Sequence, residues 1–225
     1  MFDKPIFVTG VPRSGTSMVA GALSACGAWV GKTWAGTRDN PKGFFEHVEL
    51  RERVIKELLA ELKCDTLGVR VLPDLDQLQA VPSLPEVIHR IIVNGGYEGN
   101  NPWLLKDAKL TLIWPIFVAA FPDARWIVVR RAREDIVRSC LNTVFMAQHS
   151  TDPGFWHRFV EDYENRINRL LDSVSFVREI WPEQLVCGNL EPLRKLVDDL
   201  DLGWNEPSIK AFITQEYWHA RKRHV

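Results

Sequence analysis

The chain has 225 residues, of which 46% are apolar and 25% charged, and its formal net charge at neutral pH is −1. This composition is typical of a globular protein with a substantial core, and the near-neutral charge argues against a general nucleic-acid binder. No apolar run reaches about 18 residues and no signal peptide precedes the first predicted strand, so we expect a cytoplasmic protein without a membrane partner. The cysteines have no metal-binding spacing, and three are expected to be buried free thiols: Cys26, Cys140 and Cys187.

Patterns of strand and helix alternate along the chain. Short apolar runs predict strands and apolar residues at helical spacing predict helices. The predicted strands are 5–10, 103–107, 124–129 and 184–187. The predicted helices are 16–26, 48–63, 83–94, 110–121, 133–148, 154–181, 192–200 and 207–222. Residues 28–46 form an irregular loop in this interpretation, and 64–102 form a lid or a substrate-side insertion in a single domain, 1–225.

This alternation predicts an α/β fold of three layers, similar to that of P-loop NTPases, with a mostly parallel central sheet flanked by helices. Ligands of such sheets bind at the carboxyl ends of the strands. Three polar clusters follow predicted strands: Gly10–Ser17, Lys106–Asp107 and Arg130–Arg131. We therefore expect these three clusters to line one cleft.

The first cluster has the form of a phosphate-binding turn. Gly10 and Gly15 are spaced as in the P-loop pattern G-x-x-x-x-G-K-[ST], between an apolar strand and a helix. Thr16 stands where that pattern has lysine, and Arg13 supplies a cation inside the turn instead. A usual NTPase needs the lysine for the β- and γ-phosphates. The turn is therefore predicted to hold a phosphorylated nucleotide without acting on a γ-phosphate; the alternative is a glycine-rich turn that binds nothing.

The same residues carry a family resemblance. Residues 12–17, Pro-Arg-Ser-Gly-Thr-Ser, resemble the P-[KR]-S-G-T-[ST] loop of sulfotransferases that use 3′-phosphoadenosine 5′-phosphosulfate (PAPS). In that family the loop cradles the 5′-phosphosulfate, with cations stabilising the charge that develops between sulfuryl group and leaving phosphate. The resemblance implies that the donor contacts Arg13, Ser14, Gly15, Thr16 and Ser17, and that the product is adenosine 3′,5′-bisphosphate (PAP).

A second signature follows the strand 124–129. Arg131, Asp135 and Ser139 resemble the family's Arg-x-x-x-Asp-x-x-x-Ser element, in which the arginine and the serine bind the 3′-phosphate. The charges agree with this assignment, because arginines gather where a helix N-terminus prefers anions and an arginine binds phosphate bidentately. A solvated basic helix start is the alternative. Arg130 could take the role of Arg131.

Two further stretches suggest catalytic groups. Residues 106–110, Lys-Asp-Ala-Lys-Leu, resemble a bacterial Lys-Asp-Pro-Arg-Leu stretch, which implies that Lys106 stabilises the transferring group. Animal enzymes place a histidine base where this chain has Ala108. Residues 40–46 resemble the bacterial N-x-x-G-[YF]-[FW]-E segment, and Glu46 is the expected base, with a pKa raised beside two phenylalanines.

Alternatives to these roles stay open. Lys106 can be a surface lysine at a strand end, and Glu46 can simply charge the start of the next helix. Rival bases are His47, His149 and His157. The family also draws a 3′-phosphate contact from near its C-terminus through a G-x-x-G-x-x-[KR] element, which is absent; residues 218–224 are expected to be a frayed basic tail.

The resulting hypothesis is a PAPS-dependent sulfotransferase. It transfers a sulfuryl group to a hydroxyl, or as a second choice an amine, of a small molecule, a glycan or a peptide, and it needs no metal. Glu46, Arg13 and Lys106 are the predicted catalytic groups. The alternatives are a small-molecule P-loop kinase or phosphotransferase, and a nucleotide-binding module without activity. The identity of the acceptor depends on how 28–46, 64–102 and 141–157 fold over the cleft.

Overall fold

The computed structural model describes residues 4–37 and 40–213. In this part of the chain four parallel strands form one sheet in the order β2-β1-β3-β4. The strands are β1 (Ile6–Gly10), β2 (Leu104–Lys106), β3 (Arg125–Val129) and β4 (Val177–Ile180). The predicted α/β class and the first three predicted strands are confirmed, and β1 lies inside the sheet between β2 and β3.

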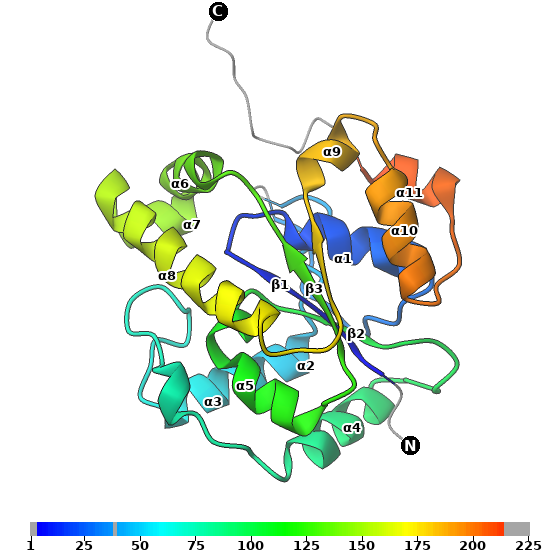
Figure 1. Ribbon diagram of the computed structural model, residues 1–225, viewed down its shortest axis with the longest axis horizontal. Coiled ribbons are helices and arrows are strands. Elements are labelled where there is room, and N and C mark those ends of the chain that lie inside the picture. Colours follow the sequence, from blue (N-terminus) through cyan, green and yellow to red (C-terminus); the bar gives the residue numbers. More distant parts are fainter. Residues whose placement is uncertain (1–3, 38–39, 214–225) are drawn as a thin grey trace, which may run out of the picture.

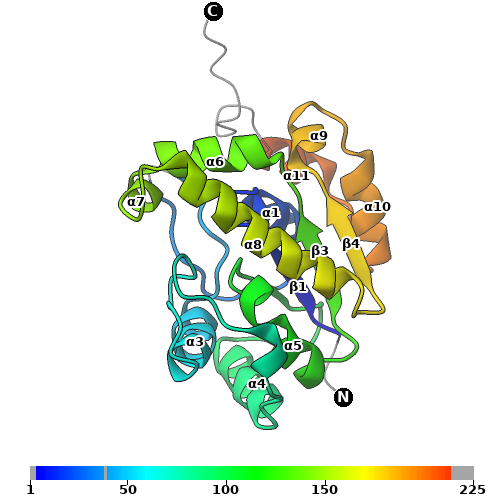
Figure 2. The ribbon, with the colours of Figure 1, turned by 60° about the vertical axis from the view of Figure 1, so that its left-hand side comes forward.

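Helices cover both faces of the sheet (Figures 1 and 2). One face packs against α5 and α8, with α3 and α4 beyond them, and the other against α1, α10 and α11. The helices on the first face are α2 (Val48–Leu50), α3 (Lys56–Glu61), α4 (Leu84–Asn94), α5 (Leu110–Ala120) and α8 (Pro153–Leu171). Also packed into the core of this face are α6 (Arg133–Asn142) and α7 (Val144–Ala147). On the other face lie α1 (Thr16–Ala25), α9 (Pro182–Val186), α10 (Glu191–Asp199) and α11 (Glu206–Phe212).

An aromatic cluster fixes the middle of the sheet. The ring of Phe7 on β1 makes edge contacts with Trp103, Phe117, Phe121 and Trp126, at centroid distances of 5.0 to 5.7 Å. All five side chains are buried. Such pairs add about 0.5–1.5 kcal/mol each to the burial of the rings, so β1 is held rigidly where it enters the predicted phosphate turn.

The region after residue 171 differs from the prediction. The helix expected over 154–181 ends at Leu171, and β4 follows at Val177–Ile180. The strand expected at 184–187 is wrong, because these residues belong to the end of α9 and its cap. The edge strand β4 has exposed Arg178 and Glu179 at its centre, which interrupts the apolar run expected of a buried strand. Pro182 then begins a helix, as proline at a first helical turn commonly does.

Two other predicted helices are interrupted, and a residue at each break, Arg51 or Thr143, lines a cavity at the carboxyl ends of the strands. The helix expected over 133–148 breaks at Thr143, whose backbone is extended, and continues as the short α7. The helix expected over 48–63 contains a π-helical turn, Arg51–Ile55, between α2 and α3. π-Helical turns, which hold one extra residue, frequently occur at functional sites.

The predicted burial of Cys187 is wrong, since its side chain is exposed after α9.

The segment 64–102 is attached to the rest of the fold rather than projecting from it. The hydroxyl of Tyr163 donates to the carbonyl of Gly68 at 2.9 Å, and Arg166 donates to that of Pro73 at 3.1 Å. Its helix, α4, buries an apolar face in the core. The role of this segment as a lid or a substrate-side insertion stays a prediction. Of the helix expected over 207–222, the structure describes α11, and the basic residues 218–224 lie outside the described part.

Candidate active site

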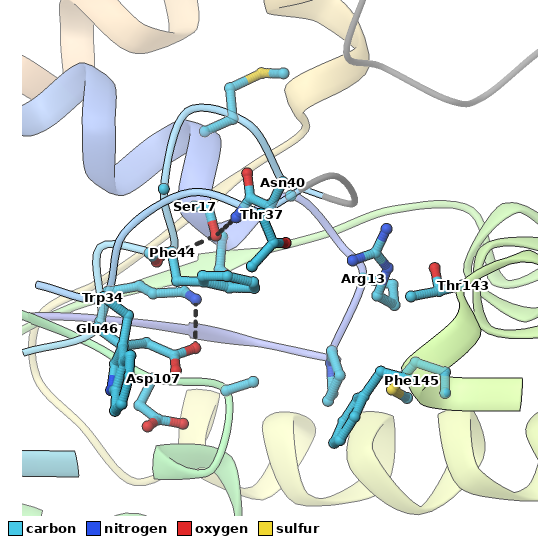
Figure 3. A pocket seen from close by; sticks show the side chains of 18 of the residues that line it. Arg13, Ser17, Trp34, Thr37, Asn40, Phe44, Glu46, Asp107, Thr143 and Phe145 are labelled. Atoms are coloured by element: carbon cyan, nitrogen blue, oxygen red, sulfur yellow. Dashed lines mark hydrogen bonds and ion pairs between the residues drawn. The ribbon is translucent and has the colours of Figure 1, made fainter. Parts of the chain in front are cut away.

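A cavity of about 630 Å³ opens at the carboxyl ends of β1, β2 and β3 (Figure 3). Its volume lies within the range of about 300–1,000 Å³ that is typical of small-ligand sites. The three polar clusters predicted from the sequence all contribute to its wall. The predicted residues that line it are Arg13, Gly15, Thr16, Ser17, Glu46, Lys106, Arg131 and Ser139.

The turn after β1 has the geometry of a phosphate loop. A side chain at Gly10 would place its Cβ 2.5 Å from the carbonyl oxygen of Val129, so only glycine lets β1 and β3 approach here. Gly15 has φ 100° and caps α1. Arg13 also has a positive φ, 74°, which is rare for a residue with a side chain and typical of strained functional loops. The amides of Gly15, Thr16 and Ser17 have no intrahelical acceptor, so they can face an anion.

Ser14 differs from its neighbours in this turn. Its side chain is fully buried and its amide donates to the carbonyl of Val11 at 3.0 Å. Its Oγ lies close to the position that a Cβ of Gly10 would occupy, and Ser14 does not line the cavity. Ser14 therefore shapes the turn from within. A direct contact between its side chain and a nucleotide would require a rearrangement.

The loop before α2 is fastened to the phosphate turn. The hydroxyl of Ser17 donates to the carbonyl of Phe44 at 3.2 Å and accepts a hydrogen bond from the side-chain Nδ2 of Asn40 at 3.2 Å (Figure 3). The ring of Phe45 packs against α1, where a Cβ on Gly21 would collide with it. These contacts fix the chain immediately before Glu46. Ser17 therefore connects the two halves of the site as well as lining it.

The second signature meets the first within the cavity. Arg131 donates through Nη1 to the carbonyl of Arg13 at 2.8 Å, and Arg13 donates through Nε to the hydroxyl of Ser139 at 3.0 Å. Burial lowers the pKa of Arg131, and neighbouring Asp135 and Glu183 only partly oppose this shift. A phosphate bound here would favour the charged guanidinium.

Arg130 lies outside the cavity. It forms an ion pair with Glu179 on β4 and donates to Asn168 on α8 at 3.2 Å. The two adjacent arginines therefore point to different surroundings, and the geometry favours Arg131 over Arg130 as the ligand of an anion in the cavity. The sequence alone left this choice open.

Glu46 lies between two cations. Its Oε1 contacts Nζ of Lys106 at 2.8 Å and its Oε2 contacts Nε of Arg51 at 2.8 Å. Burial raises the pKa of this carboxyl, but Lys106, Lys109 and Arg51 together outweigh burial and lower its pKa to about 2. The expectation of a raised pKa beside two phenylalanines is therefore wrong. Glu46 is held as a carboxylate by neighbouring cations that the aromatic context did not reveal.

A second ion pair lies beside the first. Nζ of Lys109 contacts Oδ1 of Asp107 at 2.8 Å, and the same oxygen accepts the amide proton of Lys109 at 2.8 Å. Both side chains are buried and both line the cavity. The carboxylate of Asp107 is thus paired with a lysine.

Among the described residues no group of three or more histidine, cysteine, aspartate and glutamate side chains is arranged to hold a metal ion.

None of the three rival histidines lines the cavity. His47 is buried, its Nδ1 accepts the amide proton of Leu50 at 3.3 Å, and burial lowers its pKa. His149 packs against the ring of Phe145. His157 is half-buried, 3.7 Å from Glu134. The geometry therefore favours Glu46 over these histidines as the group nearest to a ligand in the cavity.

The cavity is strongly cationic. Among the described residues, six basic and two acidic side chains line it, an excess of four positive charges. The basic ones are Arg13, Lys42, Arg51, Lys106, Lys109 and Arg131. This excess occurs in a chain whose net charge is −1, so the positive charge is concentrated in the cavity. Such a field attracts a ligand with several negative charges.

Sequence reasoning missed two kinds of residue in this wall. Arg51 and Lys109 supply cations close to Glu46, and the motif comparison gave neither of them a role. Apolar residues from three separate segments also line the cavity: Trp34, Leu67, Val69, Phe145 and Met146. No local pattern identifies them, because the tertiary fold brings these segments together. Only the break in the predicted helix at Thr143, if recognised, would have pointed to Phe145 and Met146.

The sheet order, the turn after β1 and the second signature, with Arg131 and Ser139, define a P-loop-like α/β protein. A model of the family described as "Sulfotransferase family" matches residues 5–206, and the chain belongs to this family. No curated protein matches the sequence. Family and fold together support sulfotransferase activity. None of the described helices is both long and apolar enough to span a bilayer.

Solved structures give the same fold. The sulfotransferase domain from the curacin biosynthetic pathway has a TM-score of 0.62 at 14% identity, covering 92% of this chain and 77% of that one. The sulfotransferase domain from the Synechococcus PCC 7002 olefin synthase has a TM-score of 0.60 at 13% identity, covering 96% and 79%. Sulfotransferase STF1 from Mycobacterium tuberculosis H37Rv has a TM-score of 0.54 at 18% identity, covering 94% and 71%. At these identities the similarity concerns the fold alone.

Proposed function

We propose that the protein transfers a sulfuryl group from PAPS to a hydroxyl, or as a second choice to an amine. The observation that carries this proposal is the hydrogen-bonded connection between the two anion sites: Arg131 holds the backbone of Arg13, and Arg13 holds Ser139. A nucleotide with phosphates at both its 5′ and 3′ positions needs two such sites at once. A nucleoside triphosphate carries its phosphates in one chain and has no use for the second site.

The residues present fit this donor. The first turn of α1 offers backbone amides and the hydroxyl of Thr16 to a 5′-phosphosulfate. Arg131 and Ser139 are suited to the 3′-phosphate, which carries close to two negative charges at neutral pH. The excess of positive charge in the cavity matches the charge of such a nucleotide.

When bound, PAPS supplies the sulfuryl group, and the bond between its sulfur and the 5′-phosphate oxygen is the one that breaks. The oxygen of the acceptor forms the new bond to sulfur, its proton passes to Glu46, and the bond electrons stay with the 5′-phosphate. Arg13 and Lys106 stabilise the charge that develops on the transferring oxygens. Arg51 holds the second oxygen of Glu46, which fixes the orientation of the carboxylate during proton transfer.

Lys106 has two roles in this mechanism. Without bound donor, Lys106 forms an ion pair with the Glu46 carboxylate, and a carboxylate with a pKa of about 2 is a weak base. When Lys106 turns toward sulfuryl oxygens, Glu46 loses its nearest cation, and its pKa rises toward a value better suited to accepting a proton. The ion pair therefore makes Glu46 a stronger base only when donor is present.

The test is to replace three residues in turn and to measure transfer of radiolabelled sulfate and affinity for PAPS. Glu46→Gln should lower kcat by about 10²–10⁴, the range of general-base catalysis, with little effect on donor affinity. Arg13→Ala and Lys106→Met should lower both kcat and affinity. Full activity in all three variants would refute the proposed function.

A further inference from the structure

The acceptor side of the cavity has a chemistry of its own. We propose that it is built for a neutral small molecule whose hydroxyl is carried on an apolar, aromatic body, rather than for a glycan or a basic peptide. This proposal rests on the proposed function, because it identifies the acceptor of the same reaction.

Part of the cavity wall is apolar, although six basic side chains also line the cavity. Trp34, Leu67, Val69, Phe145 and Met146 line it, and they come from three separate segments of the chain. Trp34 is 43% exposed and Phe145 is 51% exposed, while Val69 and Met146 are buried. Large apolar side chains left exposed inside a cavity commonly mark a ligand surface.

This apolar wall is adjacent to the carboxylate that would accept the proton. The backbone amide of Trp34 donates to the backbone carbonyl of Glu46 at 3.1 Å. The two residues that carry the indole and the carboxylate are therefore neighbours within one loop. In Figure 3 Trp34 and Glu46 lie at one end of the cavity, and Phe145 lies at the other end beside Thr143. An acceptor whose hydroxyl reaches Glu46 has its body between these two aromatic side chains.

The wall offers few hydrogen bonds. Of its five apolar residues only Trp34 has a polar side-chain group, the indole N–H. The hydroxyl of Thr143, which also lines the cavity, donates to the carbonyl of Ser139 at 2.7 Å. Along these five side chains the many hydroxyls of a glycan would lose water with only the indole N–H as a partner, and a cationic peptide side chain would meet the excess of positive charge in the cavity.

Aromatic geometry narrows the body of the acceptor further. Trp34 and Phe145 present ring faces and edges, and Phe44 adds a third ring to the lining. Aromatic ligands gain from offset or edge-to-face contacts with such rings, beyond the area that they bury. A flat, neutral aromatic alcohol or phenol makes such contacts with its whole body.

The test compares acceptors at saturating PAPS. The probes are 2-naphthol as the neutral aromatic hydroxyl, D-glucose as the sugar, and a short peptide with one tyrosine between lysine residues. We expect kcat/KM for 2-naphthol to exceed that for either other probe at least tenfold. A sugar or a peptide that is used as well as 2-naphthol, or no transfer to 2-naphthol up to its solubility limit, would overturn the proposal.

The wall itself is tested with Phe145→Ala and a matched control, Val144→Ala. Val144 is the neighbouring residue of α7, is 69% exposed and does not line the cavity. Phe145→Ala should raise KM for 2-naphthol, and its Kd in the presence of PAP, about tenfold, with the affinity for PAP changed less than twofold. The control should leave all three values unchanged. Equal loss of PAP affinity, or equal effects of both variants, would contradict the assignment.

Failure of this proposal can be distinguished from failure of the proposed function. Binding of PAP is measured first by calorimetry and does not depend on the acceptor. A protein that does not bind PAP refutes the proposed function and the acceptor class with it. A protein that binds PAP and prefers glucose or the peptide keeps the proposed function and refutes only the acceptor class.

Discussion

Replacing Glu46 with glutamine removes the carboxylate that Lys106 and Arg51 contact, and it isolates the electrostatics of the site. The pKa of Glu46 falls from its ordinary value of 4.5 to about 2 in the folded protein. A group whose folded pKa is depressed stabilises the fold above the unfolded pKa. It loses that contribution as the pH falls through the folded pKa, here between about 4.5 and 2.

The size of the effect follows from these two pKa values. A shift of about 2.5 pH units corresponds to roughly 3 kcal/mol of stability at pH 7. At pH 3.5 about 2 kcal/mol of this contribution remains. The difference in free energy of unfolding between wild type and Glu46→Gln should therefore shrink by about 1.4 kcal/mol between pH 7 and pH 3.5. Glutamine does not titrate, so the pH dependence of this difference belongs to Glu46.

Urea unfolding followed by tryptophan fluorescence at a series of pH values measures this difference. Lys106→Met should remove a large part of the same pH dependence, because it takes away the cation that contacts Oε1 of Glu46. A difference between wild type and Glu46→Gln that stays constant within about 0.5 kcal/mol over this pH range would refute the reasoning. It would mean that the surrounding cations do not hold Glu46 as an ionised group.

Three further predictions concern the anion sites and the turn. Arg131→Ala should lower the preference for PAP over AMP by roughly 10- to 150-fold in calorimetry, the range of a charged hydrogen bond, while Arg130→Ala should leave it unchanged. A variant of Arg131 that still prefers PAP would mean that the 3′-phosphate site is misassigned. Gly10→Ala should cost about 2 kcal/mol and lower Tm by roughly 4–8 °C, because its Cβ would meet the carbonyl oxygen of Val129; an unchanged Tm would contradict the close approach. Lys106→Met should reduce kcat by about 10²–10³ in the transfer assay, and a normal kcat would exclude it from charge stabilisation.

The sequence predicted the central strands well because each has a clear local signal. β1 and β3 are apolar runs that end at a glycine or at arginines, and the helix after β1 begins where the glycine turn ends. The edge strand β4 gave no such signal, because Arg178 and Glu179 face solvent at its centre. The wrong strand at 184–187 arose because a short apolar run cannot distinguish a strand from the end of a short helix.

The same distinction applies to the site. The phosphate turn and the Arg131–Ser139 element are contiguous motifs, and the rule for strand ends brought them together correctly. The surroundings of Glu46 were not predictable in this way. Its pKa depends on Arg51, which a π-helical turn presents, and on lysines 60 or more positions away along the chain. The apolar part of the cavity wall likewise depends on how three separate segments come together, which no local pattern specifies.

Calorimetric titration with PAP, compared with ATP and Mg²⁺, tests the central claim most directly. Two separate anion sites joined through Arg13 predict clear binding of PAP and much weaker binding of ATP with Mg²⁺. Tight binding of ATP with Mg²⁺ and no measurable binding of PAP would contradict the proposed function and return the protein to the P-loop phosphotransferases.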